Sequence, residues 1–374
     1  MTGIAEFLKA PQAGFEAEDD FDAVNAYCLE RGWTDGLPIV PPTPERVERM
    51  LAYCDRPWDQ SVGEIPPRYG AATPLRVAAN AVMAGCRPEY FPLVLLALEA
   101  MIEERFNLYG TQATTHSCAP MIIVNGPVAH ELGINSGHNA LGSGTHANAT
   151  IGRAVRLALV NIGAAVSGLG DMATYGSPAK FSYCAAENEA ASPWDPLHVE
   201  RGFPVESSTV TVVAAEPPHN INDHESVTAE GILKTMAGNM STPGVNDIYH
   251  LLAEPVILFC PEHAVSVAQG GFSKADVKRY FYENARVPFN RFSDENIERR
   301  LRKRAGFGEL YAHAGMDTLV PLAKSAEAFM IVVIGGAGRH SAFIPTFGGT
   351  RSVTRALKHA DGRNVLTIQD LRQS

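Results

Sequence analysis

The sequence predicts an α/β protein whose sheets, mainly parallel or mixed, are flanked by helices and preceded by a helical N-terminal portion. One observation is a set of short, almost continuously apolar runs, which are typical of strands buried on both faces. These runs are residues 120–126, 207–216, 254–261 and 328–336. A second observation is that a polar loop and a segment with helical spacing follow each of the last three runs. Such alternation favours parallel strands joined by right-handed crossovers.

Helices are predicted ahead of the first strand. Residues 22–31 have helical spacing, and a helix restarts after Thr43, which can cap it with Pro44 at the first helical position. The segment between them, GWTDGLPIVPPT, holds prolines and glycines that forbid regular structure. Thr73-Pro74 begins another helix, and PEYFPLVLLALEAMIEE, from residue 88, completes a helical hairpin.

The loops after the last three strands carry histidines. The loops are PPHNINDHES, PEH and AGRHS, and helices are expected from Val227, Ala264 and Arg351. In open α/β sheets the ligand crevice lies beyond the carboxyl ends of the strands. The histidines placed there are His219, His224, His263 and His340, of which His340 is a substrate-binding candidate. The alternative is that these are solvated loop residues.

Composition limits the class of protein. A chain of 374 residues that is 45% hydrophobic can bury a large core. We expect an N-terminal helical segment (1–110), a site-bearing α/β region (111–205) and a strand-loop-helix region (206–374). The formal net charge is −10, and we expect no basic stripe and no nucleic-acid partner.

Location is also constrained. The acidic N-terminal arm lacks the basic start and apolar core of a signal peptide, and the apolar run 91–102 is too short to span a bilayer. The six cysteines are scattered and include no CxxC pair, so we expect reduced thiols and a cytoplasmic protein without membrane partners.

An anion site is predicted after the first strand. Glycines, including Gly144, let a loop approach a ligand, and Asn148 or Thr150 can cap a helix whose free N–H groups attract an anion. Arg153, one turn inside, would grip a carboxylate or phosphate. The glycines could instead serve helix packing. No dinucleotide fingerprint and no P-loop occur, so no cofactor is expected.

A catalytic thiol is predicted just before the first strand, in YGTQATTHSCAP. If this segment is extended, His116 and Cys118 share a face, and the imidazolium would lower the thiol pKa and produce a nucleophile. Asn125, which ends the first strand, is a substrate-binding candidate. The alternative for Cys118 is a loop thiol of no consequence.

Carboxylates form a third candidate cluster, in SPAKFSYCAAENEAASPW. Glu187 or Glu189, in a partly apolar cleft, would have a raised pKa and serve as general acid or base. Lys180 is a substrate-binding candidate and His146 a further catalytic candidate. A solvated acidic loop is the alternative.

A metal site is weighed against these assignments. Its candidate ligands are His116, Cys118, His138, His146, Glu187 and Glu189. There is no HExxH, HxH or CxxC spacing among them, so we assign no metal ligands.

Several long strings resemble a known family. They are RGWTDGLPIVPPT, NAVMAGCRPEYFPLV, IVNGP followed by LGIN, THANATIGRAVRL, CAAENEAASPW and PEHAVSVAQGGFSKADVKRYFYENAR. They resemble the bacterial family related to, or encoded beside, the UGSC-motif (seleno)proteins, over nearly the whole chain. The family's Sec/Cys-Gly-Ser-Cys motif is absent here, the nearest string being His116-Ser117-Cys118, so no selenium or dithiol chemistry is carried over. The resemblance implies a catabolic or tailoring role in small-molecule metabolism and supplies no reaction.

The sequence therefore predicts an enzyme of lyase or hydrolase type acting on a small polar or anionic substrate. His116 and Cys118 would be base and nucleophile, and Asp35 lies at the tip of a proline-rich wall or lid. A metal-dependent enzyme with the same residues, or a non-catalytic partner of a redox protein, are the alternatives. A homo-oligomer is possible on the sequence.

Overall fold

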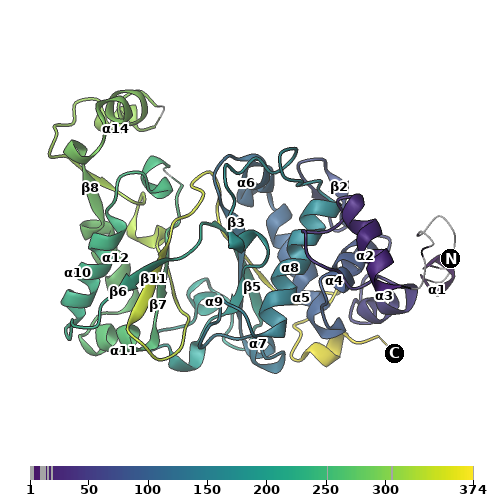
Figure 1. Cartoon of the computed structure of the whole chain (residues 1–374). Coiled ribbons are helices and arrows are strands. Elements are labelled where there is room, and N and C mark those ends of the chain that lie inside the picture. The colour runs from purple at the N-terminus through teal and green to yellow at the C-terminus, as the bar shows by residue number, and fades with distance from the viewer. Residues whose placement is uncertain are drawn as a thin grey trace.

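A computed structural model describes residues 4–8, 14, 17, 20–250, 252–304 and 306–373. It confirms the α/β fold, built as four layers in the order helices, sheet, sheet, helices (Figure 1). The principal helices are α1 (Ile4–Leu8), α2 (Phe21–Glu30), α3 (Pro44–Leu51), α4 (Pro74–Met83), α5 (Phe91–Ile102), α6 (Leu108–Ala113), α7 (Pro127–Glu131), α8 (His146–Asn161), α9 (Leu197–Glu200), α10 (Ala229–Met240), α11 (Pro261–Gln269), α12 (Lys274–Asn284), α13 (Asp294–Asn296) and α14 (Gly308–Tyr311).

Two four-stranded mixed sheets form the centre. The first has the order β12 (Val353–Ala356), β5 (Thr209–Ala215), β3 (Ala119–Asn125), β4 (Cys184–Ala186). The second has the order β10 (Met330–Val333), β7 (Val256–Phe259), β11 (His340–Ile344), β6 (His219–Asn222). Only β3–β4 and β7–β10 are parallel; the other neighbours in these sheets are antiparallel. Two-stranded ribbons add β1 (Glu64–Ile65), β2 (Gly70–Ala71), β8 (Arg286–Pro288) and β9 (Leu319–Pro321).

The strand residues alternate between two cores, as the pleat requires. In β3, Met121 and Ile123 belong to the core between the sheets, whereas Ile122 and Val124 face helices. In the second sheet, Leu258 faces the first sheet and its neighbour Phe259 faces helices. Both faces are therefore buried, as the continuous apolar runs predicted.

The predicted N-terminal helices are present as α2 to α5. Thr73 accepts a hydrogen bond from the Arg76 N–H at 3.3 Å and caps α4. Thr43 occupies the corresponding position before α3, but its side chain makes no capping hydrogen bond. Helices α4, α5 and α8 share one core with the outer face of the first sheet, so residues 1–110 do not form a separate unit.

The last predicted strand-loop-helix unit is wrong, because residues 340–344 and 353–356 form β11 and β12 where a loop and a helix were expected. Both pair antiparallel with neighbouring strands. Similarly, β6 lies within the loop expected at 217–226. The first sheet contains strands from before and after residue 205, so the domain boundary expected there would divide one sheet.

Two strands are exchanged between the sheets. The order strand, two helices, two strands occurs as β3–α7–α8–β4–β5, with one-turn α9 inserted. It occurs again as β7–α11–α12–β10–β11, with residues 286–321 inserted between α12 and β10. The chain then leaves β5 to add β6 to the second sheet, and leaves β11 to add β12 to the first. The two crossing segments pair with each other, since the Glu216 N–H donates to Pro345 O at 2.8 Å and the Phe347 N–H to Ala214 O at 2.9 Å.

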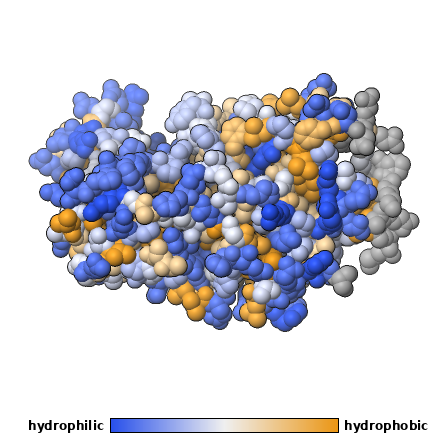
Figure 2. Space-filling view, turned by 60° about the horizontal axis from the view of Figure 1, so that its bottom comes forward, coloured by the Kyte–Doolittle hydropathy of each residue, from blue (hydrophilic) through white to orange (hydrophobic). Residues whose placement is uncertain are grey.

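Residues 286–321, here called the projecting segment, contain β8, α13, a π-helical turn (Ile297–Leu301), α14 and β9. Helix α14 stands out from the rest of the molecule at the upper left of Figure 1. In the described part of the chain, no helix is long and apolar enough to cross a membrane. Hydrophilic residues cover most of the face shown in Figure 2, with hydrophobic patches between them.

Candidate functional site

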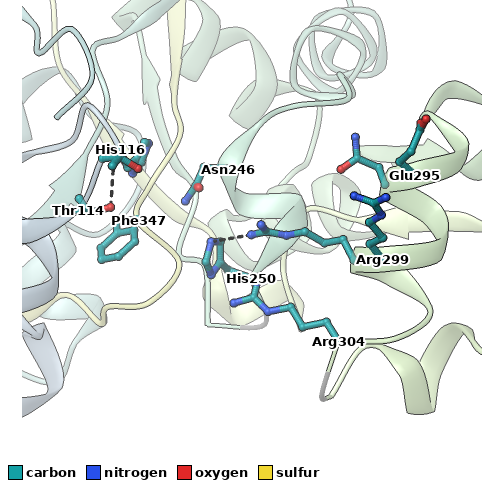
Figure 3. A pocket seen from close by; sticks show the side chains of 11 residues that line it. Thr114, His116, Asn246, His250, Glu295, Arg299, Arg304 and Phe347 are labelled. Atoms are coloured by element: carbon teal, nitrogen blue, oxygen red, sulfur yellow. Dashed lines mark hydrogen bonds between the residues drawn. The ribbon is translucent and has the colours of Figure 1, made fainter. Parts of the chain in front are cut away.

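A cavity of about 880 Å³ lies where the crossing segments meet the projecting segment. It is lined by Thr114, Thr115, His116, Asn246, His250, Glu295, Asn296, Arg299, Arg300, Arg304 and Phe347. Figure 3 shows Thr114, His116 and Phe347 on one side and the side chains of Arg299 and Arg304 on the other, with His250 between them. We call it the arginine cavity.

His116, which lines this cavity, forms a dyad with the carboxylate of Glu216, which is not itself one of the lining residues. Strands β3 and β5 are antiparallel with Ala119 opposite Ala215, so residues just before β3 lie beside those just after β5. The imidazole Nε2 of His116 consequently lies 2.5 Å from a carboxylate oxygen of Glu216. The His116 backbone N–H donates to Thr114 Oγ1 at 3.1 Å. The other ring nitrogen, Nδ1, is covered and has no hydrogen-bond partner among the described residues. A carboxylate that orients an imidazole in this way is typical of general acid-base sites.

Three arginines form the opposite wall. Within the described ranges, no carboxylate lies at ion-pair distance from Arg299, Arg300 or Arg304. The contacts they make are to neutral groups: Arg304 donates to Tyr249 O at 3.2 Å, and Arg300 lies over the Tyr249 ring with Nε buried and unpartnered. The three arginines outnumber Glu295, the one carboxylate among the residues that line the cavity, so a protein of net charge −10 has a positive wall here, as an anion site requires.

His250 is neutral at neutral pH. Burial, followed by the positive charges of Arg304 and Arg300, lowers its pKa to about 4. Its Nε2 lies 3.4 Å from an Arg300 terminal nitrogen, from which a neutral imidazole can accept a hydrogen bond. It therefore helps to position the arginine wall without adding charge.

A buried acid lies beside the crossing segment that carries Phe347. Asp247 is fully buried and accepts from the Thr346 N–H at 3.1 Å and from Thr346 Oγ1 at 2.8 Å. Burial raises its pKa to about 7, and the charge of Glu216 acts in the same direction. These bonds fix the crossing segment that carries Phe347.

The predicted carboxylates assemble at the other end of β3. Asn125 Nδ2 donates to Glu187 at 2.7 Å and to Glu189 at 2.9 Å, and the Gly126 N–H donates to Glu189 at 2.7 Å. Glu187 also accepts from the Leu197 N–H at 2.8 Å. Burial raises the pKa of Glu187. His198, which the sequence did not single out, has Nδ1 3.8 Å from Glu189.

In the Asn125–Glu187–Glu189 cluster, only Glu189 reaches the surface, with its side chain 31% exposed. Glu187 and Asn125 are buried, and neither lines one of the large cavities. Gly126 has φ +86°, and a Cβ there would lie 2.2 Å from Ser207 O, so the backbone approaches too closely for a side chain. The hydrogen bonds of the cluster link β3, β4 and α9, while Asn125 Oδ1, Glu187 Oε1 and His198 Nδ1 are buried without a partner among the described residues. The raised pKa of Glu187 agrees with the expectation, and its role as a general acid or base stays a prediction.

Cys118 is not placed as a nucleophile. Its side chain is 1% exposed, and Sγ lies 3.9 Å from Thr111 O. Burial raises the pKa of the thiol to about 12, against a smaller lowering by Lys180. The strand begins only at Ala119, so the shared face expected for His116 and Cys118 does not exist. The expected thiolate is corrected by this burial.

The anion site expected at α8 is also corrected. Arg153 makes two 2.8 Å hydrogen bonds to the Asp35 carboxylate and a third to Pro38 O, with Asp35 only 5% exposed. Asp35 therefore anchors the proline-rich segment and is not the tip of a lid. Helix α8 begins at His146, and the side chain of Asn148 bonds Asn135 and Ala140 instead of capping it.

The remaining candidates lie apart from the arginine cavity. Lys180 pairs with Asp171 at 2.7 Å, and His146 packs 5.8 Å from the Tyr90 ring. Burial, and then Arg87, lowers the pKa of His146. Gly144, at φ +112°, has open space on the side where a Cβ would point, and it touches neither cluster.

The loop histidines separate into two groups. His340 begins β11, and its Nε2 lies 3.1 Å from His224 Nε2 on the surface. His263 is instead buried within α11, bonded to Ser341 Oγ at 2.8 Å and Asp223 O at 2.9 Å. His263 therefore contacts the residues next to His340 and His224, as a shared location predicts, but its ring is buried and does not line a crevice.

The six metal-ligand candidates are dispersed. In the part of the chain that the structure describes, no three His, Cys, Asp or Glu side chains are close enough to hold a metal ion. His116 faces Glu216, whereas the Cys118 thiol contacts Thr111.

Comparison of the chain with known protein families, curated proteins and solved structures finds no match. Function is therefore inferred from side-chain geometry. The sequence reasoning missed Glu216, which ends a predicted strand, and the run ERRLRKR at 298–304. The prediction that the chain has no basic stripe did not take this run into account.

Proposed function

We propose that the protein is an enzyme of lyase or hydrolase type that moves a proton on a small anionic substrate in the arginine cavity. The observation that carries the proposal is the pairing of a carboxylate-held imidazole, His116–Glu216, with three arginines that have no carboxylate partner within the described residues. The arginines would hold the anionic group, and the dyad would exchange a proton with the reacting end of the same molecule.

The cavity volume supports a small-molecule substrate. About 880 Å³ lies within the range of small-ligand sites, and the dyad and the arginine wall occupy opposite sides of it. Thr114 and Asn246 add neutral hydrogen-bonding groups for the substrate body. This replaces the thiol mechanism with imidazole and carboxylate chemistry and assumes no cofactor.

We also propose that the protein is associated with UGSC-motif proteins, is cytoplasmic and forms a homo-oligomer. Six free cysteines in the described chain are compatible with a reducing compartment. A non-catalytic role as partner of a redox protein is the second candidate, and it predicts no turnover by the purified protein.

The experiment has two stages. Thermal unfolding is measured with a panel of mono- and dicarboxylates and phosphate esters, because a ligand that binds only the folded state raises Tm. Anions that bind are then incubated with the protein in D2O, and deuterium incorporation or product formation is followed by NMR. We expect binding to require Arg299 and Arg304, and exchange to require His116. Equal stabilisation of wild type and Arg299→Gln/Arg304→Gln by every anion would overturn the proposal.

A further inference from the structure

Two loop histidines, His224 and His340, meet on the surface of the second sheet. His340 begins β11, and His224 lies two positions after Asn222, the end of β6. Because these neighbouring strands are antiparallel, with His340 opposite Asn222, the beginning of one and the end of the other lie at the same end of the sheet. Both side chains are exposed, and neither lines the arginine cavity, so the proposed function makes no use of them.

The two imidazole rings are inclined, so their Nε2 atoms do not point straight at each other. The Nε2 atoms are 3.1 Å apart and the ring centroids 4.9 Å apart, with the ring planes at 75°. Rings aimed straight at each other, as in a linear N–H···N hydrogen bond, would have centroids about 5.4 Å apart at this separation of the nitrogens. With equal inclination, the two lone-pair axes meet about 2 Å from each nitrogen, which is the length of a zinc–imidazole bond.

Asn220 selects the tautomer of His340 that can bind a metal ion. The ring nitrogen Nδ1 of His340 lies 3.1 Å from the side-chain oxygen Oδ1 of Asn220. Because an amide oxygen only accepts hydrogen bonds, Nδ1 carries the proton and donates, and Nε2 retains its lone pair. Metal-bound histidines usually donate their other ring N–H to an oxygen in this way.

The charges next to the pair in the chain favour a cation. The carboxylates of Asp223 and Glu225 flank His224, and Arg339 precedes His340. The Arg339 guanidinium donates to the backbone oxygen of Asp223, at 3.2 Å, and to that of Ser226. Two carboxylates therefore stand against one arginine whose N–H groups are turned to the backbone.

We propose that His224 and His340 bind a divalent transition-metal ion of the zinc class through their Nε2 atoms. Imidazole nitrogen is a suitable ligand for Zn²⁺, Cu²⁺ and Ni²⁺. Over the described residues no third His, Cys, Asp or Glu side chain completes the group, so water occupies the remaining positions of the ion. The two ligands are 116 positions apart in the chain, so the site exists only in the folded protein, where the ion links the loop after β6 to β11.

The test uses the intact protein, freed of metal by dialysis against EDTA. Thermal unfolding is followed during titration with Zn²⁺, because an ion that binds only the folded state raises Tm by mass action. We expect Zn²⁺ to raise Tm, EDTA to reverse the rise, and His224→Ala or His340→Ala to weaken Zn²⁺ binding by about tenfold or more. Asn220→Ala, which removes the acceptor of the Nδ1 proton, should weaken it about tenfold. Electron paramagnetic resonance of one equivalent of Cu²⁺ should show two nitrogen ligands in wild type.

Matched controls separate a metal site from a hydrogen bond between two imidazoles. His219 is exposed at the beginning of β6, so His219→Ala is the control on the same strand and should bind Zn²⁺ as wild type does. His116→Gln should also leave Zn²⁺ binding unchanged, so this inference and the proposed function fail independently. If Zn²⁺ does not raise the Tm of wild type, or raises that of the double variant His224→Ala/His340→Ala equally, the pair is a hydrogen bond only and the assignment is wrong.

Discussion

The imidazole of His116 and the carboxylate of Glu216, one hundred positions apart in the chain, lie 2.5 Å from each other. The antiparallel pairing of β3 with β5 places one residue before its strand and the other after its strand at the same edge. The same edge receives the crossing segment that carries Phe347, whose ring lies 5.7 Å from that of His116. The dyad therefore depends on sheet topology and on the exchange of strands.

The dyad is tested by two substitutions. His116→Gln should reduce proton exchange on the bound anion by about 10²- to 10⁴-fold, the usual contribution of a general acid-base group. Glu216→Gln keeps a hydrogen-bond acceptor but removes the charge, so we expect a smaller loss and a changed pH-rate profile. NMR-detected exchange measures both, and unchanged rates in His116→Gln would exclude the dyad from the chemistry.

The arginine wall is tested by binding. Since a hydrogen bond to a charged group contributes about 1.5–3 kcal/mol, Arg299→Gln or Arg304→Gln should each weaken anion binding about tenfold or more. Isothermal titration at two salt concentrations provides the measurement. Arg279 lies exposed on α12 and pairs with Asp276, so Arg279→Gln is the matched control and should bind anions as wild type does. If Arg299→Gln and Arg304→Gln weaken anion binding no more than Arg279→Gln does, these arginines do not bind the anion.

Asp247 predicts a pH-dependent stability. Its folded pKa, about 7, exceeds the ordinary aspartate value of 3.8, so the folded state binds the proton more tightly and stability falls as pH rises through this interval. Urea unfolding should show wild type losing about 3 kcal/mol relative to Asp247→Asn between pH 5 and pH 8, because each pKa unit corresponds to about 1.4 kcal/mol. A constant difference between the two proteins at both pH values would show that Asp247 is ionised when folded.

The Arg153–Asp35 pair predicts a structural effect. Removal of one partner of a largely buried ion pair costs about 3 kcal/mol or more, so Arg153→Ala should lower the free energy of unfolding by that amount. Anion binding in the arginine cavity should stay unchanged once the variant is folded. Denaturant unfolding and titration measure the two effects, and weaker anion binding without a stability loss would restore the site first expected at α8.

Cys118 predicts slow thiol chemistry. With a pKa of about 12 and 1% exposure, it should react with iodoacetamide in the native protein more slowly than partly exposed Cys54. Cys118→Ala should retain proton exchange on the anion. Cys118→Ser should cost about 1–3 kcal/mol of stability, because a buried hydroxyl replaces a thiol whose one close polar contact is Thr111 O. If Cys118→Ala folds normally but no longer exchanges protons on the bound anion, the thiol takes part in the mechanism.

The sequence by itself determined the elements that depend on neighbouring residues. Apolar runs located β3, β5, β7 and β10, and Thr-Pro pairs located the beginnings of α3 and α4, because strand burial and helix initiation are local effects. It also located Asn125, Glu187 and Glu189, which meet because Asn125 ends β3, Glu187 directly follows the adjacent parallel strand β4, and Glu189 lies two residues farther along.

Only the tertiary structure decided which residues share a cavity. Periodicity indicates which face of a strand is buried but not which strand pairs with it, so β6, β11 and β12 were not recognised and the exchange between sheets was not foreseen. For the same reason, the sequence did not show that Cys118 contacts Thr111 and not His116, or that Arg153 pairs with Asp35. The arginines that face His116 are about 180 positions away in the chain, and the pairing of the crossing segments, together with the fold of the projecting segment, brings them there.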